Sequence, residues 1–210
     1  MYIALDEIRI RNAVSADARQ LADWWNDGAV MAHAGFPNGL GITAEEIARS
    51  LAGDRDDKRR RLIIEYRAKA IGEMSFSVRD NRTAEIGIKI CNPDYREKGL
   101  GRIVLSMLIH ELFFMGCEKV VLDTNLENRR AQHVYELLGF EKKRVNIDSW
   151  TDQLGRPQSS VDYELTPERF RDFSAESGGN AAPRQKPPLI SEGRRARRVP
   201  DISQGGRDRR

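Results

Sequence analysis

The segment REKGLG, residues 96–101, combines two glycines with charged side chains at the start of a stretch of helical periodicity. Apolar residues at positions 100, 104, 107, 108, 112 and 115 predict a helix over 100–115. The first turn of a helix has unpaired N–H groups and the positive end of the helix dipole, and both favour phosphate. The glycines let a ligand approach the backbone closely, and Arg96, Lys98 and Arg102 can add positive charge. The segment is therefore predicted either to bind an anion or to be a flexible glycine turn at the start of a helix.

Two familiar phosphate-binding loops can be compared with this segment. A Walker A loop needs a lysine and a serine or threonine after its last glycine, and no such pair follows Gly101. A dinucleotide-binding loop needs a third glycine where Val104 stands. Asp123, at the end of the next expected strand, does imitate the acid that binds ribose in such proteins. The Walker loop is therefore excluded, whereas the dinucleotide loop is only weakened.

A predicted hairpin precedes the anion-binding segment. The runs AIGEMSFSV (70–78) and TAEIGIKI (83–90) have strand character and flank a short turn. One register collects the apolar side chains on a single face, and a slip by one residue would mix the two faces. This register predicts the pairs Ser77 with Glu85, Ser75 with Gly87, and Glu73 with Lys89. The hairpin then has a polar strip, beginning at Glu85, that faces water or a ligand.

The remaining elements alternate between helices and strands. Further strands are expected over 7–13, 61–66 and 118–124, with a final hairpin of 142–150 and 159–165. Helices are expected over 15–25 with Ser15 as N-cap, over 43–51 with a capping box from Thr43 to Glu46, over 128–139 with Asn128 as N-cap, and over 167–173 as a closing helix after Thr166. This order predicts a single mixed α/β domain.

Composition separates a folded part from a basic tail. Residues 174–210 hold nine Lys or Arg against four Asp or Glu, and they lack apolar periodicity. We expect a folded domain over 1–173 and a disordered tail over 174–210. The run RRARR (194–198) is a candidate contact for nucleic acid, although a solvated basic tail is the commoner explanation for such a run.

The sequence carries no sign of export, membrane insertion or a metal site. No apolar run reaches the roughly 20 residues of a membrane span, and the N-terminus lacks the apolar core of a signal peptide. Cys91 and Cys117 are the only cysteines and are expected as buried free thiols. The three histidines are scattered along the chain, which predicts no metal site. We expect a cytoplasmic protein, either a monomer or a homodimer.

The order and spacing of these motifs resemble the GCN5-related N-acetyltransferase (GNAT) superfamily. The family's Arg/Gln-x-x-Gly-x-Gly/Ala loop is matched by Arg96, Gly99 and Gly101. A later signature is matched by Asn128, Ala131, Tyr135, Gly139 and Phe140. The resemblance is strong over 84–145 and extends more weakly over 1–173. The segment Trp24–Asp27 and the final hairpin are similar to the branch that includes ribosomal-protein N-terminal and antibiotic acetyltransferases.

The resemblance implies a mostly antiparallel sheet with a central splay, flanked by helices, and acetyl-CoA as the acetyl donor. The pyrophosphate of the coenzyme would be held at the glycine loop, and its pantetheine arm would pair with the end of the preceding strand. No metal is implied. The coenzyme-binding residues implied in this way are Ile90, Cys91, Arg96, Lys98, Gly99, Leu100, Gly101, Arg102 and Asn128.

The implied reaction is direct attack of a primary amine on the acetyl group, which needs a base and an acid. Such an amine is mostly protonated at neutral pH, so a base must help to remove its proton. We favour Glu85, whose position matches the base of histone acetyltransferases, and Asp123 is the alternative. Tyr135 is the expected acid for the thiolate, although its place among apolar residues would also suit a core aromatic.

The acceptor amine is not identified by the sequence. Small amines, aminoglycosides and protein N-termini all remain open, and the N-terminal helices and the hairpin 144–165 should border the acceptor cleft. Trp24, Trp25 and Phe36 are candidate lining residues, although Trp25 lies on the apolar stripe of its helix. A non-catalytic acyl-CoA sensor is the alternative function, because it would keep the loop and Asn128 without needing Tyr135 or a base.

Overall fold

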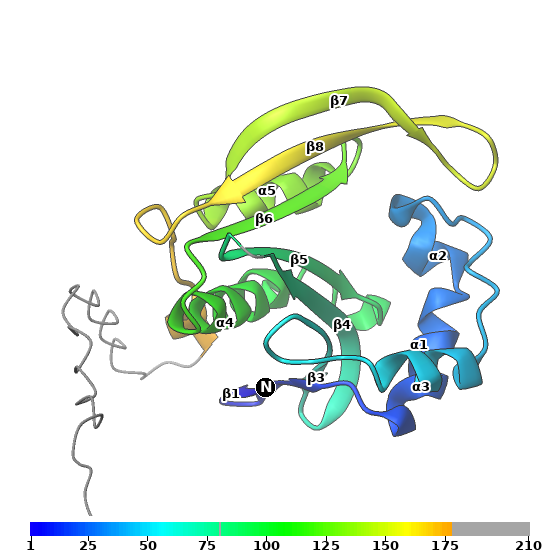
Figure 1. The fold of residues 1–210 in the computed structure, drawn as a ribbon, viewed down its shortest axis with the longest axis horizontal. Helices are drawn as coiled ribbons and strands as arrows, with labels where there is room; N and C mark the ends of the chain where they lie inside the picture. Colours follow the sequence, from blue (N-terminus) through cyan, green and yellow to red (C-terminus); the bar gives the residue numbers. More distant parts are fainter. Residues whose placement is uncertain (80, 178–210) are drawn as a thin grey trace, which may run out of the picture.

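The computed structural model describes residues 1–79 and 81–177, and Figure 1 shows their arrangement. One eight-stranded sheet has the order β1-β2-β3-β4-β5-β6-β8-β7. Its strands are β1 (Tyr2–Leu5), β2 (Ile8–Asn12), β3 (Arg59–Tyr66), β4 (Lys69–Val78), β5 (Thr83–Ile90), β6 (Lys119–Asn125), β7 (Glu141–Thr151) and β8 (Pro157–Leu165). All neighbouring pairs are antiparallel except β5 with β6. The expected mixed α/β fold with a mostly antiparallel sheet is confirmed.

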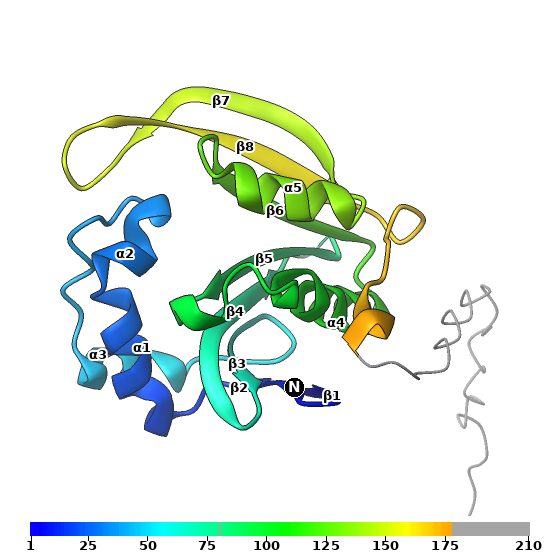
Figure 2. The same ribbon diagram turned by 180° about the vertical axis from the view of Figure 1, so that it is seen from behind.

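Helices cover both faces of the sheet, as the opposite views in Figures 1 and 2 show. The α-helices are α1 (Ala18–Trp25), α2 (Gly28–Met31), α3 (Ala44–Leu51), α4 (Leu100–Phe114) and α5 (Arg129–Leu137), and the 3-10 helices are η1 (Ser15–Asp17), η2 (Ala32–Ala34), η3 (Pro93–Tyr95) and η4 (Ser174–Ser177). Leu62 and Ile64 of β3 join the buried cluster around α4, whereas Ile63 joins the cluster around α1 and α3. The apolar run in β3 is continuous because both of its faces are covered.

The sheet opens between β5 and β6. These strands pair only over Thr83–Glu85 and Lys119–Val121, after which β5 continues to Ile90 and β6 to Asn125 without further pairing between them. The predicted hairpin register is confirmed on the other side of β5, where Ser77, Ser75 and Glu73 of β4 face their expected partners. The splay therefore exposes one edge of β5 at the end nearest the glycine loop.

Helix capping is predicted well where the cap is local. Thr43 and Glu46 form the expected capping box of α3. The side chain of Asn128 accepts a hydrogen bond from the N–H of Ala131 at 3.3 Å and caps α5 as expected. Ser15 instead begins a 3-10 helix, and Asp17 occupies the N-cap position of α1.

Two expectations about the chain ends are wrong. Strand β1 precedes the first expected strand, and residues 166–173 contain a turn but no helix. The N–H of Arg171 donates to the carbonyl of Leu138, and the N–H of Phe173 donates to Oγ of Ser106. Because these donors serve other elements, the segment stays non-helical. The tail prediction falls, from residue 178 onward, outside the described residues.

Candidate active site

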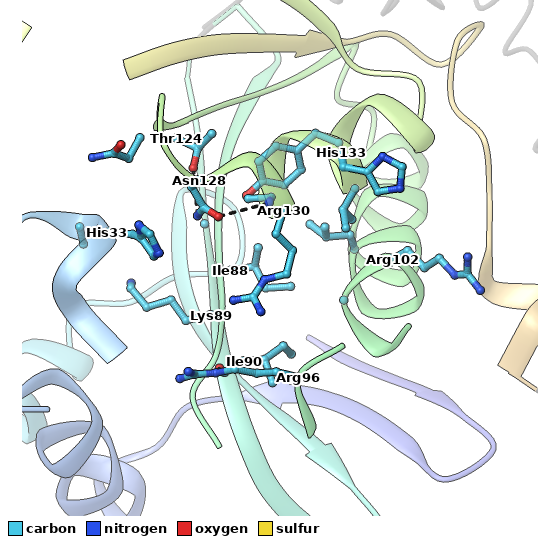
Figure 3. A pocket seen from close by; sticks show the side chains of 18 of the residues that line it. His33, Ile88, Lys89, Ile90, Arg96, Arg102, Thr124, Asn128, Arg130 and His133 are labelled. Atoms are coloured by element: carbon cyan, nitrogen blue, oxygen red, sulfur yellow. Dashed lines mark hydrogen bonds between the residues drawn. The ribbon is translucent and has the colours of Figure 1, made fainter. Parts of the chain in front are cut away.

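A cavity of about 840 Å³ occupies the splay between β5 and β6. Its walls come from α2 and η2, the open edge of β5, the end of β6, and the first turns of α4 and α5. Figure 3 shows side chains that line it from these elements. Because the glycine loop lies at one end and α2 at the other, a single cavity connects the two faces of the sheet.

The glycine loop presents open backbone at the start of α4. Gly99 is the N-cap residue and has a φ of 75°, in the left-handed region that favours glycine. Gly101 follows in the first turn, and a Cβ atom built on it would meet no atom within 4 Å. The cavity is also lined by Asn128 and Arg130 at the start of α5. Two helix N-termini therefore border it, as an anion-binding site requires.

Arg96 holds the loop against the end of β5. Its guanidinium donates to the carbonyl oxygens of Ile90 and Cys91, with both distances 3.0 Å. The sequence predicted only a positive charge for the anion at this position. The structure adds a second role, since Arg96 fixes the end of the strand along which the pantetheine arm was expected to lie.

The expected coenzyme-binding residues fall into two groups. Those that line the cavity are Ile90, Arg96, Gly99, Gly101, Arg102 and Asn128. Cys91, Lys98 and Leu100 are not among the lining residues of the described chain. Cys91 is buried against α1 and α3, and its burial, with the charge of Glu73, raises the pKa of its thiol to about 12. Lys98 lies over the ring of Tyr95 at 5.6 Å, and the Leu100 side chain is in the core.

Arginines approach the glycine loop from different directions. Arg102 extends along α4 toward the C-terminal segment, where its guanidinium lies 5.4 Å from the ring of Phe173 (Figure 3). Arg130 of α5 forms an ion pair with Glu97 of the loop at 2.8 Å. Arg130 was not among the coenzyme-binding residues predicted from the sequence, although its position two residues after the N-cap Asn128 was a usable signal.

The two candidate bases lie in different environments. Glu85 is paired with Arg79, is 44% exposed, and is not among the residues lining the cavity. Asp123 lines the cavity, and its pKa is raised by burial and by the nearby charges of Asp162 and Glu85. A raised pKa makes the Asp123 carboxylate better matched to accepting a proton near neutral pH.

Tyr135 lines the cavity and is also part of the core. Its ring contacts those of Phe140 and Tyr163, with centroid distances of 5.8 and 5.7 Å. Burial, followed by the charge of Asp123, raises the pKa of its phenol to about 12. The core position expected for this residue and its access to the cavity are thus compatible.

The end of the cavity near α2 is lined by side chains that were not predicted from the sequence as site residues. His33, Lys89 and Trp150 are among them, and Figure 3 shows Lys89 and His33 on the same side of β5. The ring of Trp150 packs so closely on Gly35 that a Cβ there would lie 2.3 Å from it. Lys89 was placed correctly on the polar strip, but nothing in its local sequence marked it as a lining residue.

The hairpin tip closes over this end of the cavity. Gln153 accepts a hydrogen bond from the N–H of Asn38 at 2.9 Å and donates from its side chain to the carbonyl of Gly39 at 3.0 Å. Its own N–H donates to the carbonyl of Gly35 at 2.8 Å. The hairpin, whose Trp150 lines the cavity, is therefore tied to the loop after η2.

The aromatic residues expected in the acceptor cleft lie elsewhere. Trp24, Trp25 and Phe36 are not among the lining residues of the described chain. Trp24 is the buried residue of the pair, whereas Trp25 is only half-buried and donates its indole N–H to Glu73 at 2.8 Å. The indole N–H needs an acceptor when it leaves water, and Glu73 supplies one.

The described residues contain no helix long and apolar enough to cross a membrane. They also contain no group of three or more His, Cys, Asp or Glu arranged to hold a metal ion.

This arrangement of a splayed sheet, a glycine loop at a helix start and a cavity through the splay is that of an acyltransferase fold. The acetyltransferase (GNAT) domain family matches residues 7–141, and the chain belongs to this family. The chain is 33% identical, over 70 residues, to the ribosomal protein bS18 alanine N-acetyltransferase of Escherichia coli K12. That match covers 33% of this chain, and the chain spans 47% of the length of the relative.

Solved structures show the same fold at low sequence identity. The spermidine N-acetyltransferase of Vibrio cholerae, in complex with CoA and spermine, has a TM-score of 0.69 and 21% identity, covering 78% of this chain and 98% of that one. A ribosomal L7/L12 alpha-N-protein acetyltransferase in complex with coenzyme A has a TM-score of 0.71 and 15% identity, covering 79% and 98%. These likenesses confirm the expected fold.

Proposed function

We propose that this protein transfers an acetyl group from acetyl-CoA to a primary amine by direct attack. The observation that carries the proposal is the cavity itself, which connects the glycine loop to Asp123 and Tyr135 through the splay. The family membership and the coenzyme in related structures support acetyl-CoA as the donor. The acceptor is a small-molecule amine or a protein N-terminus.

Asp123 and Tyr135 belong to opposite faces of the sheet. Glu85 and Val121 are register partners and share a face, so strand alternation places Asp123 on that face as well. Tyr135 packs on Tyr163, the register partner of Leu122, and residue 122 points to the other face. An amine arriving from the α1–α3 side would therefore meet Asp123, whereas a coenzyme arriving from the α4–α5 side would meet Tyr135.

The coenzyme supplies the acetyl thioester. The chain's own groups would hold the coenzyme and protonate its leaving thiolate. Backbone N–H groups at Gly99–Arg102 and the N-terminus of α5 would bind the pyrophosphate. The open edge of β5, fixed by Arg96, would orient the arm. Asn128 would contact the arm near the splay.

We propose Asp123, in preference to Glu85, as the group that takes the amine proton, directly or through a water molecule. Its place in the cavity and its raised pKa support this choice. The amine nitrogen then bonds to the acetyl carbon, the carbon–sulfur bond breaks, and the sulfur leaves as a thiolate. That thiolate would take its proton from the Tyr135 hydroxyl.

Transfer of the proton from Tyr135 to the thiolate has an energetic cost that depends on the charge of Asp123. A phenol with a pKa of about 12 gives its proton to a thiolate of pKa about 8.5 at a cost of about 5 kcal/mol. The charge of Asp123 is one cause of that raised pKa. Once Asp123 has accepted the amine proton, this cause is removed and the cost falls. The order of the two proton transfers therefore matters.

The proposal is tested by measuring free thiol release from acetyl-CoA with a panel of primary amines. We expect acceptor-dependent release, and a rise in melting temperature with CoA but not with NAD. Stabilisation by CoA without thiol release with any amine would instead indicate the acyl-CoA sensor. Stabilisation by NAD alone would indicate a dinucleotide-binding protein.

A further inference from the structure

We propose that Lys89 selects acceptors in which a carboxylate lies close to the reacting amine, and that polyamines are poor acceptors. The inference rests on the proposed function and concerns the acceptor end of the same cavity. It starts from the charges that line this end. Apart from Asp123, the only acid among the described lining residues is Glu97, which lies in the glycine loop and is paired with Arg130.

Lys89 lies on the acceptor face of the open strand. It follows Glu85 and Gly87 by strand alternation, so it shares the face of Asp123 across the splay. Its side chain is 33% exposed, and Figure 3 shows it extending toward the element that carries His33. The charge nearest to an arriving acceptor, besides that of Asp123, is therefore positive.

The counter-ion of Lys89 lies beneath the cavity surface. Oε1 of Glu73 accepts from Nζ of Lys89 at 3.1 Å and from the indole N–H of Trp25 at 2.8 Å. The Glu73 side chain is only 8% exposed, and it is not among the lining residues. An acceptor in the cavity thus meets the ammonium of Lys89 but not the carboxylate that fixes it.

The distance between Asp123 and Lys89 limits where the carboxylate must be. Measured along the strands from the register pair Glu85–Val121, Lys89 lies four residues out and Asp123 two residues out. The difference of two residues corresponds to about 7 Å along the strand direction, and the opening between β5 and β6 adds a sideways separation. An amine at Asp123 would therefore bring a carboxylate one or two residue lengths away within reach of the lysine.

A polyamine needs the opposite arrangement. Its second ammonium would approach Lys89 rather than a carboxylate, and like charges at close range disfavour binding. The related spermidine N-acetyltransferase shares the fold at 21% identity, which leaves the acceptor charges of this chain free to differ. The acceptor class follows from the charges of this cavity, not from that likeness.

The experiment compares acceptors that differ only in charge. The peptides Ala-Glu-Ala-amide, Ala-Gln-Ala-amide and Ala-Lys-Ala-amide share a free N-terminus and lack a C-terminal carboxylate. The pair 4-aminobutyrate and its amide tests the same chemistry in a small molecule, and spermidine represents the polyamines. Thiol release gives kcat/KM for each acceptor, and the ratio of the Glu to the Gln peptide is the readout. We expect this ratio to be about 5 or more, as for a partly exposed charge pair.

Variants at the Lys89–Glu73 pair separate a charge role from a structural one. Lys89→Met should bring the ratio close to one, and Lys89→Arg should largely restore it. Glu73→Gln removes the competing carboxylate, so it should raise the ratio above that of the wild type. If Lys89 only stabilised Glu73, Lys89→Met and Glu73→Gln would each lower activity with every acceptor. The ratio of the Glu peptide to the Gln peptide would then stay unchanged. Lys58→Met, at an exposed lysine outside the cavity, is the matched control.

Lys89→Met leaves the buried carboxylate of Glu73 without its ammonium partner and could fail to fold for that reason alone. The double variant Glu73→Gln/Lys89→Met removes this carboxylate as well, so it separates loss of selectivity from loss of folding. Its ratio should also be close to one, with the CoA-induced rise in melting temperature retained. A wild-type ratio of one or less, or a preference for spermidine, would overturn the inference while leaving the acetyltransferase standing. No thiol release with any acceptor would overturn both.

Discussion

The two glycines of the glycine loop, Gly99 and Gly101, predict opposite effects of the same substitution on stability. Gly101 lies in the first turn of α4, and an added methyl group would meet no atom of the protein within 4 Å. Alanine is better than glycine inside a helix by up to about 1 kcal/mol. Gly101→Ala should therefore leave the free energy of unfolding unchanged or raise it by up to that amount. Gly99 has a φ of 75°, so Gly99→Ala should lower it by about 1–2 kcal/mol.

The family loop accepts either glycine or alanine at the position of Gly101, so a methyl group there is compatible with a bound pyrophosphate. A long, negatively charged side chain would instead stand where the pyrophosphate must approach the backbone. We therefore expect Gly101→Ala to keep the Kd for CoA within about threefold and Gly101→Glu to weaken CoA binding at least about tenfold, which corresponds to about 1.4 kcal/mol. Denaturant unfolding without ligand gives the stability, and isothermal titration with CoA gives the affinity. If Gly101→Glu bound CoA as tightly as the wild type, the loop would not be the pyrophosphate site. If Gly101→Ala unfolded more easily than the wild type, the added methyl group would not have the open space that the structure gives it.

Four further predictions concern the proton-transfer groups and the fold. Tyr135→Phe keeps the ring packing, so it should leave the Kd for CoA within about twofold and cut turnover by about 100-fold or more; unchanged turnover would remove the hydroxyl from the mechanism. Asp123→Asn should cut turnover far more than Glu85→Gln does, and the reverse order would assign the base to Glu85. The raised pKa of Asp123 also means that the folded state binds its proton more tightly than the unfolded state does. The stability that protonated Asp123 contributes is therefore lost as pH rises from the ordinary pKa of 3.8 through the raised pKa. By thermal unfolding at neutral pH, Asp123→Asn should therefore be more stable than the wild type. Burial raises the pKa of Asp54, but hydrogen bonds from Arg61 at 2.8–2.9 Å outweigh it and lower the pKa overall. The stability that the Asp54–Arg61 pair contributes should be present at neutral pH and be lost as pH falls below 3.8. Asp54→Asn should therefore lower the free energy of unfolding by about 3 kcal/mol in denaturant unfolding at neutral pH. A decrease of less than about 1 kcal/mol would mean that the buried charge of Arg61 finds other partners.

Local patterns in the sequence determined much of the framework of the site. The register of β4 with β5 followed from alternation, because only one register buries the apolar side chains together. The caps at Thr43 and Asn128 followed from residue type, since each satisfies N–H groups within its own first turn. The glycine loop before α4 also followed from residue type, because Gly99 has a φ of 75°, in the left-handed region that favours glycine.

Tertiary packing decided which of the predicted groups meet. Asp123 lines the cavity and Glu85 does not, because β5 and β6 part directly after the pair Glu85–Val121, and Asp123 lies beyond this point whereas Glu85 does not. Residues 166–173 have a good helix start, but the N–H groups of Arg171 and Phe173 donate to Leu138 and Ser106 instead of continuing a helix. Lys89 lines the cavity with its ammonium paired to Glu73 of β4, and Glu73 also accepts from the indole N–H of Trp25 of α1. Capping and alternation act within a few residues and can be read from the chain, whereas the splay and its charges depend on contacts between segments that lie far apart in it.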